Sequence, residues 1–161
     1  MKQLHLLELT SDTFLPYGRF ASLLVPNGPV LGEKPIRFFR DLLPLGNGKA
    51  LAASVTQVEV MPMKVETMEF HTYTWEAFLS LDSDSCICVA PATGTAELNP
   101  DTLEIFRVPS GTMIYLHPGV WHYAPFPLGR STLHSLVILP ERTYVNDCVK
   151  VTIAEPRMID V

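Results

Sequence analysis

Proline and glycine recur along the whole chain and divide it into short segments. The 161 residues include 14 prolines and nine glycines, which are spread through the sequence rather than gathered in one region. Because proline interrupts helices and both residues favour turns, this distribution leaves little room for long helices. The sequence therefore predicts a mainly β protein built from short strands.

Seven strand-like runs follow Gly48, and each is bounded by proline, glycine or a small polar residue. The expected strands are 50–60, 63–71, 76–81, 86–91, 103–108, 112–117 and 131–139. Short runs of this kind suggest a β-sandwich or barrel. Near the start of the chain, Thr10-Ser11-Asp12-Thr13-Phe14 can cap and begin a short helix that ends before Pro16. The stretch from Pro26 to Pro44 is expected to be rich in loops.

The composition suits one folded domain that covers residues 1–161. Hydrophobic residues make up 47% of the chain and charged residues 18%, which argues against a disordered or fibrous protein. The net charge of -5 offers no general attraction to phosphate backbones or anionic lipids, so nucleic acids and membranes are poor candidate partners. No signal-peptide pattern or spanning apolar run is evident, and the three cysteines are expected to be reduced thiols. We therefore expect a cytoplasmic protein.

Two polar residues stand near the end of the expected strand 63–71. Strict alternation places Glu69 and His71 on one face, together with residues 63, 65 and 67. If that face points inward, both side chains enter the interior, where a charge is expensive unless it is paired, hydrogen-bonded or bound to metal. Glu76 follows five residues later, a separation that places it on the opposite face of an unbroken strand. A turn through residues 72–74 could return it to the same side.

A second histidine follows two glycines at a regular spacing. Gly111, Gly119 and His122 are separated by eight and then three residues, and Pro118 bends the chain before the second glycine. Taken singly, a histidine or glutamate is more simply an ordinary polar side chain, but together they indicate a shared site. Imidazole and carboxylate ligands suit a divalent ion such as zinc, nickel, iron or manganese. The candidate metal ligands are Glu69, His71, Glu76 and His122.

Other side chains are candidates for binding a substrate. Tyr115 and His117 share strand parity, so both could line the same cavity or fill the mouth of the fold. Trp121 could form a wall for a small ligand or pack around the turn. A guanidinium binds a carboxylate through two hydrogen bonds, although each arginine is also simply a surface cation. The arginines considered for this role are Arg37, Arg40 and Arg130.

Four motifs together resemble a known family. The segment from Gly111 to His122 resembles the second motif of the cupin superfamily, and Glu69-Phe70-His71 with Glu76 is similar to the first. More specifically, the chain resembles the ureidoglycolate lyase family, once called ureidoglycolate hydrolases. The motifs that carry this resemblance, in chain order, are Phe14-Leu15-Pro16-Tyr17-Gly18, Met68-Glu69-Phe70-His71, Tyr115 to Trp121-His122, and Asn146-Asp147-Cys148.

The resemblance implies a fold and a reaction. The expected fold is an all-β, cupin-type sandwich or barrel (jelly roll) with a short N-terminal helix, often assembled as a homodimer. The expected enzyme splits ureidoglycolate into glyoxylate and urea in purine and allantoin breakdown. This reaction needs a base for the hydroxyl proton and an acid for the departing urea nitrogen. We expect His71 or His122 to be the base, Glu69 to orient it or bind metal, and the other histidine to be a ligand or the acid.

Two alternative functions stay open. Phe70 replaces the arginine that the family usually has at this point, and Glu76 stands where it usually has glutamine. These differences alter the charge of the expected pocket and favour a cupin enzyme, such as an isomerase, for another small hydroxy or sugar acid. A cupin that binds a small molecule without catalysis is the other alternative, because one fold serves many functions. We expect a small carboxylate as the substrate and nickel, zinc or manganese as the cofactor.

Overall fold

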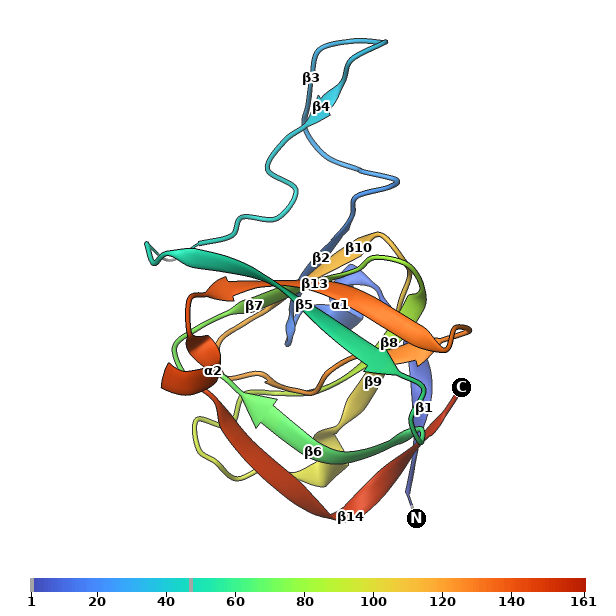
Figure 1. Cartoon of the computed structure of the whole chain (residues 1–161), viewed down its shortest axis with the longest axis vertical. Helices are drawn as coiled ribbons and strands as arrows, with labels where there is room; N and C mark the ends of the chain where they lie inside the picture. The colour runs from blue at the N-terminus through green and yellow to red at the C-terminus, as the bar shows by residue number, and fades with distance from the viewer. Residues whose placement is uncertain (1, 47) are drawn as a thin grey trace.

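Strands dominate the structure, a computed structural model that describes residues 2–46 and 48–161 (Figure 1). Its two α-helices, α1 (Ser11–Phe14) and α2 (Thr143–Asn146), contain four residues each, and a 3-10 helix, η1, spans Pro100–Thr102. No helix in this part of the chain is long and apolar enough to cross a membrane. The prediction that residues 1–161 form one domain stays a prediction, and it includes Met1 and Asn47, which lie outside the described residues.

The larger sheet closes on itself. In spatial order its strands are β11 (Trp121–His122), β6 (Lys64–Phe70), β14 (Val149–Asp160), β1 (Gln3–Glu8), β9 (Glu104–Val108), β8 (Asp84–Ala90) and β12 (Phe126–Leu128). Because the short strand β11 pairs with both β6 and β8, the strands from β11 to β8 form a closed ring. This closure places His122 directly opposite Glu69 of β6.

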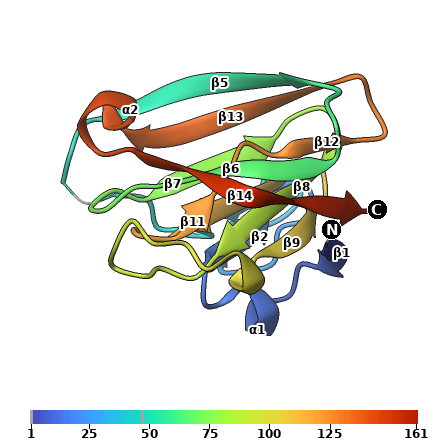
Figure 2. The same cartoon turned by 90° about the horizontal axis from the view of Figure 1, so that it is seen from below.

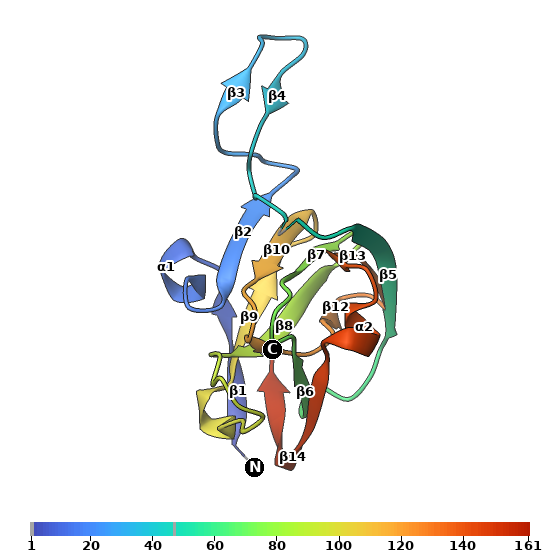
Figure 3. The ribbon, with the colours of Figure 1, turned by 90° about the vertical axis from the view of Figure 1, so that its left-hand side faces the viewer.

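The second sheet is fully antiparallel and covers part of the first. Its strands, in spatial order, are β2 (Gly18–Ser22), β10 (Thr112–Leu116), β7 (Glu76–Ser80), β13 (Thr132–Pro140) and β5 (Leu51–Glu59). Figure 2 shows β5 and β13 as a layer above β6 and β14. A separate pair, β3 (Val30–Leu31) and β4 (Phe38–Phe39), forms an arm that extends away from the body (Figures 1 and 3).

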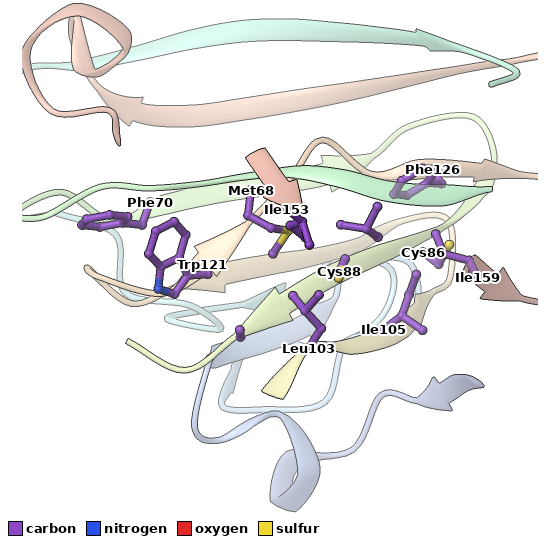
Figure 4. Close-up of a cluster of buried hydrophobic side chains, with 12 residues drawn as sticks. Met68, Phe70, Cys86, Cys88, Leu103, Ile105, Trp121, Phe126, Ile153 and Ile159 are labelled. Carbon is purple, nitrogen blue, oxygen red and sulfur yellow. The ribbon is translucent and has the colours of Figure 1, made fainter. Parts of the chain in front are cut away.

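Two clusters of buried side chains fill the fold. The inner cluster comes from the closed sheet and includes Met68, Phe70, Cys88 and Trp121, with the Trp121 ring beside the Phe70 ring (Figure 4). The intersheet cluster packs β8 and β9 against the second sheet and α1. Truncation of a large side chain in such a core costs about 3–5 kcal/mol, so both clusters matter for stability. The main members of the intersheet cluster are Phe14, Phe78, Phe106, Ile114, Leu116 and Val137.

Helix α1 forms where the sequence predicted it. The Thr10 hydroxyl accepts a hydrogen bond from the Thr13 amide at 3.2 Å, and the Thr13 hydroxyl accepts one from the Thr10 amide at 3.3 Å. These reciprocal bonds satisfy amides that a helix start leaves unpaired. Phe14 is fully buried against Phe106, with ring centroids 5.2 Å apart, and this contact fixes the helix on the larger sheet.

The predicted all-β, cupin-type barrel with a short N-terminal helix is confirmed by this topology. The seven expected strands correspond to β5 to β10 and β13, within a few residues at each end. The region from Pro26 to Pro44 contains only the two short strands of the arm, as expected, and all three cysteines are free. The sequence did not predict the terminal strands β1, β2 and β14 or the short strands β11 and β12.

Candidate active site

Glu69 near the end of β6 and His71 directly after it lie on the face opposite the inner-cluster residues of the strand. Met68 and Phe70 are buried in the inner cluster, so the side chains that alternate with them leave the other face. The expected alternation does not extend along the whole strand. Val65, expected on the same face as Glu69, is also buried in the inner cluster. The pairing of β6 with β14 is irregular at this point: Thr67 lies opposite Thr152 and Val65 lies opposite Arg157, so β14 carries the extra residues.

The glycine turn brings His122 to the same place. Trp121 points into the inner cluster, so the neighbouring His122 points out of it and lies opposite Glu69. Gly119 has a φ of 83°, in the left-handed region that a side chain would disfavour, and its amide donates a 2.7 Å hydrogen bond to the His71 carbonyl. The two distant motifs therefore meet through the backbone as well as through their side chains.

A carboxylate holds the turn that carries the chain from His71 to Glu76. One oxygen of Asp147, Oδ1, accepts a hydrogen bond from the Thr72 amide at 2.7 Å. The other, Oδ2, accepts bonds from the amides of Tyr73 and Thr74 and from the Thr74 hydroxyl, each at 2.9 Å. These bonds fix the turn that returns Glu76 to the side of His71, as the sequence allowed.

The two imidazoles converge on one carboxylate oxygen. Nδ1 of His71 lies 2.7 Å from the Asp147 carbonyl oxygen, and Nδ1 of His122 lies 2.9 Å from the Val120 carbonyl oxygen. Because a carbonyl only accepts, each Nδ1 donates, and each Nε2 is left to face Glu76. The distance from Glu76 Oε2 is 2.9 Å to Nε2 of His71 and 3.3 Å to Nε2 of His122. A positive charge, either a proton or a metal ion, therefore stabilises this centre.

Burial and charge act in opposite directions on these groups. Burial alone would raise the pKa of Glu76, but the adjacent imidazoles of His122 and His71 outweigh it and lower that pKa to about 2. Burial alone would lower the pKa of His122, but the Glu76 carboxylate outweighs it and raises that pKa. Glu76 is therefore ionised near neutral pH, and its charge favours the protonated form of His122.

The residues also fit a divalent metal ion. Ligand atoms of Glu69, His71 and His122 all lie within 4.8 Å of one another. Nε2 of His122 is buried and has no hydrogen bond of ordinary geometry, although Glu76 is close to it. In both rings Nδ1 is held by a backbone carbonyl, the arrangement that orients a histidine for binding metal through Nε2. Three such ligands suit several divalent metals and select no single one.

A cavity of about 240 Å³ opens beside this centre, between the β6–β14 and β5–β13 layers. Glu69 is held at its wall by Lys150, whose Nζ is 3.1 Å from Oε2, and by the Cys148 thiol at 3.4 Å. Burial and the Glu69 charge raise the pKa of Cys148 to about 11, so this thiol stays protonated near neutral pH. The titratable side chains that line the cavity are Glu69, His71, Glu76, Arg142, Tyr144, Cys148 and Lys150.

Larger hollows lie elsewhere on the molecule. One beside α1 has a volume of about 280 Å³, and one beside the base of the arm has a volume of about 580 Å³. Both are lined mainly by apolar side chains. The smaller cavity is the better candidate because it contains the converging acid and imidazole groups.

The structure places Tyr115 and His117 away from the cavity. In β10 it is Leu116 that lies opposite Glu76, whereas Tyr115 lies opposite Ala77 and so faces the other side of the sheet. The His117 ring contacts the Tyr115 ring on that side, with centroids 5.6 Å apart. The expectation that they line the site is corrected, because strand parity turns both outward.

The expected roles of Trp121 and Arg37 are also corrected. Trp121 is fully buried in the inner cluster, and its Nε1 donates to the Thr93 hydroxyl at 3.2 Å, so it packs and does not form a ligand wall. Arg37 lies exposed between β3 and β4, with its guanidinium 5.4 Å from the centre of the Phe39 ring. It belongs to the arm, which extends away from the barrel (Figure 3).

Sequence reasoning missed four lining residues from the chain after β13: Arg142, Tyr144, Cys148 and Lys150. The sequence contained a signal for Cys148 and Lys150. Cys148 ends the Asn146-Asp147-Cys148 motif and Lys150 follows two residues later, so in a strand both side chains lie on the same face. Arg142 had none, because its place depends on how α2 folds back from β13 to β14.

A comparison with protein families agrees with the motifs. The model of the ureidoglycolate lyase family matches residues 1–160. Among solved structures, one of Bacillus subtilis oxalate decarboxylase from work on its Mn(II) centres is 20% identical, with a TM-score of 0.46, and the match covers 65% of this chain and 24% of that one. Another, determined at pH 4.6, is 19% identical, with a TM-score of 0.45 and the same coverage. The chain thus spans about a quarter of the length of these decarboxylase chains.

No curated protein matches the chain. The match to the family nevertheless extends over nearly every residue, and it includes the segments that carry the acid and imidazole groups described above. This chain belongs to the ureidoglycolate lyase family, a family of enzymes.

Proposed function

We propose that this protein cleaves ureidoglycolate into glyoxylate and urea. Membership of the family supports this reaction. The observation that carries the proposal is the Glu76 carboxylate, which lies within 3.3 Å of two imidazole nitrogens beside a small cavity. This arrangement offers a proton acceptor and a proton donor to one small molecule.

The reaction moves one proton from oxygen to nitrogen. In ureidoglycolate, the carbon next to the carboxylate carries both a hydroxyl group and the ureido nitrogen. When the hydroxyl proton leaves, its oxygen forms the carbonyl of glyoxylate and the carbon–nitrogen bond breaks. The nitrogen keeps the bonding electrons and takes up a proton to give urea. The cleavage therefore needs an acid and a base but consumes neither water nor an oxidant.

Two residues that line the cavity can make these transfers. Nδ1 of His71 faces a carbonyl and Nε2 faces Glu76, so a proton on Nε2 lies between the ring and the carboxylate. We assign Glu76 as the acceptor of the hydroxyl proton and His71 as the donor to the departing nitrogen. The proton then returns from Glu76 to His71 across their 2.9 Å contact. His122 does not line the cavity and acts through Glu76, so the structure favours Glu76 over the expected histidine as the base.

In a metal-bound form, Glu69, His71 and His122 are the residues that would hold a divalent ion. That form is an alternative to the proton transfer by His71, because both use Nε2 of this ring. Such an ion supplies a Lewis acid that polarises the carboxylate and hydroxyl oxygens of a substrate. Nickel, zinc and manganese are the metals we propose to test first. Elemental analysis of protein purified without added metal measures which ion, if any, accompanies the chain.

The direct test is release of glyoxylate from ureidoglycolate by the purified protein, with a chelator and with each of the three metals. We expect product above the uncatalysed rate, and loss of at least about a hundredfold in kcat for Glu76→Gln and His71→Ala. His134→Gln is the matched control, because His134 pairs with Asp82 outside the cavity and should keep full activity. No product above background in any condition would refute the proposal. A panel of small hydroxy and sugar acids then tests the other enzyme class, and binding without turnover indicates a binding protein.

We further propose that the enzyme works as a cytoplasmic homodimer in purine and allantoin breakdown. The arm supports the dimer, because its apolar side chains are exposed and such patches commonly pack against a partner. Light scattering of the purified protein tests the assembly, and a monomer at micromolar concentration would contradict it. The exposed apolar residues of the arm are Val30, Leu31, Ile36 and Phe38.

A further inference from the structure

The charged side chains around the cavity pair with one another, with one exception. Lys150 pairs with Glu69 at 3.1 Å, and His71 pairs with Glu76 at 2.9 Å. Arg142 lines the same cavity, but among residues 2–46 and 48–161 no carboxylate lies within 4.0 Å of its guanidinium. The wall of the cavity therefore presents one guanidinium without a carboxylate partner, which can pair with a negatively charged group of a ligand.

Backbone contacts fix the position of Arg142. Its φ of 63° lies in the left-handed region, which is uncommon for a residue with a side chain. The Arg142 carbonyl accepts hydrogen bonds from the amides of Val145 and Asn146, each at 3.0 Å, and the next residue, Thr143, donates its hydroxyl to the Pro140 carbonyl at 2.7 Å. These contacts fix the backbone of Arg142 beside the cavity, between β13 and α2 and outside any regular strand.

Guanidinium is the side-chain group best suited to a carboxylate. Its planar N–H donors form two parallel hydrogen bonds with the two carboxylate oxygens, and its charge persists at all working pH values. In ureidoglycolate the carboxylate is attached to the carbon that reacts. A group that holds the carboxylate therefore also sets the distance from that carbon to Glu76 and His71, which line the same cavity.

We infer that Arg142 is the anchor for the substrate carboxylate and that it makes the site selective for small monocarboxylates. This inference rests on the proposed function and assigns one end of the substrate to one residue. Lys150 has a different task, because its ammonium group already holds Glu69. The role expected from the sequence for Arg37 thus passes to an arginine from the segment between β13 and β14.

Kinetics of arginine variants test this assignment. We expect Arg142→Gln to raise KM for ureidoglycolate about tenfold to hundredfold, as loss of a charge-assisted pair predicts, with a smaller change in kcat. Arg142→Lys should lie between this variant and the wild type, because it keeps the charge but loses the paired geometry. Arg37→Gln is the matched control and should leave KM unchanged. An unchanged KM in Arg142→Gln, with turnover intact, would overturn the inference and leave the proposed function standing.

A binding measurement separates the inference from the reaction. Calorimetry with glyoxylate and with its neutral amide should show tighter binding of the acid to the wild type, and Arg142→Gln should abolish this preference. If ureidoglycolate is not turned over but the preference depends on Arg142, the proposed reaction fails and the carboxylate site stands. Equal affinity for acid and amide in the wild type overturns the inference. Arg142→Asn, which tolerates the left-handed backbone, serves as a second variant if Arg142→Gln melts early.

Discussion

Replacement of Asp147 by asparagine should weaken the fold and the reaction together. Its carboxylate holds the turn that joins His71 to Glu76, and its backbone carbonyl accepts the hydrogen bond from Nδ1 of His71. Both proposed proton-transfer groups are therefore positioned by this one residue. A substitution that keeps the shape of the side chain but removes its charge tests that role without opening a cavity.

The size of the effect follows from the hydrogen bonds. Oδ1 accepts one bond and Oδ2 accepts three, whereas an asparagine has only one oxygen that can accept. The best orientation puts the amide oxygen at the Oδ2 position, so the NH2 group then faces the Thr72 amide, donor against donor. A hydrogen bond to a charged group contributes about 1.5–3 kcal/mol, and the exposure of Thr72 moderates its loss. We expect a cost of about 2 kcal/mol, which lowers Tm by roughly 4–8 °C in a chain of this size.

The pH dependence of this cost has a defined sign. Burial alone would raise the pKa of Asp147, but the hydrogen bonds from residues 72–74 outweigh it and lower that pKa. A carboxyl whose pKa is lower in the folded state stabilises the fold above its unfolded pKa, near about 3.9, and this contribution is lost as pH falls through the folded value. The stability difference between wild type and Asp147→Asn should therefore be full at neutral pH and shrink in acid.

Urea denaturation and glyoxylate release measure the two effects on the same preparation. Asp82→Asn is the matched control, because Asp82 accepts the His134 amide at 3.0 Å and contacts its ring at 2.6 Å, outside the cavity. It should lower stability but leave kcat unchanged, whereas Asp147→Asn should lower both. If Asp147→Asn unfolds at the wild-type urea concentration and keeps its kcat, the argument from these hydrogen bonds is wrong.

Three further predictions address the site and the core. The Glu76 contribution to stability should be present above its unfolded pKa of about 4.3 and should disappear as pH falls toward its folded pKa of about 2. The His122 contribution should be present below its unfolded pKa of about 6.5 and should disappear as pH rises through its raised folded pKa. Urea denaturation of wild type and Glu76→Gln over a pH series measures both contributions. Trp121→Ala should lower the unfolding free energy by about 3–5 kcal/mol because it leaves a cavity in the inner cluster. An effect below about 1 kcal/mol would contradict the packing role. Gly18→Ala should lower the unfolding free energy by about 3 kcal/mol, because a Cβ there would lie 1.8 Å from the Tyr115 carbonyl oxygen. If this variant melts at the wild-type temperature, β2 and β10 do not approach each other this closely.

Local patterns in the sequence were sufficient for much of the fold. Regular alternation between turn residues located β5 to β10 and β13, and Thr10 with Phe14 located the first helix. The same patterns singled out Glu69, His71, Glu76 and His122, which the structure brings together, although their roles stay predictions. These signals are readable because strand alternation, capping and glycine turns depend on neighbours within a few residues.

The remaining features depend on pairings between distant segments. Ring closure through β11, the pairing of β10 with β7, and the return of the chain through α2 decide which side chains face the cavity. They turn Tyr115 and Trp121 away from it and bring in Arg142 in place of Arg37. A one-residue change of register reverses every side chain of a strand, so the composition of the cavity is set by tertiary packing and not by the local sequence.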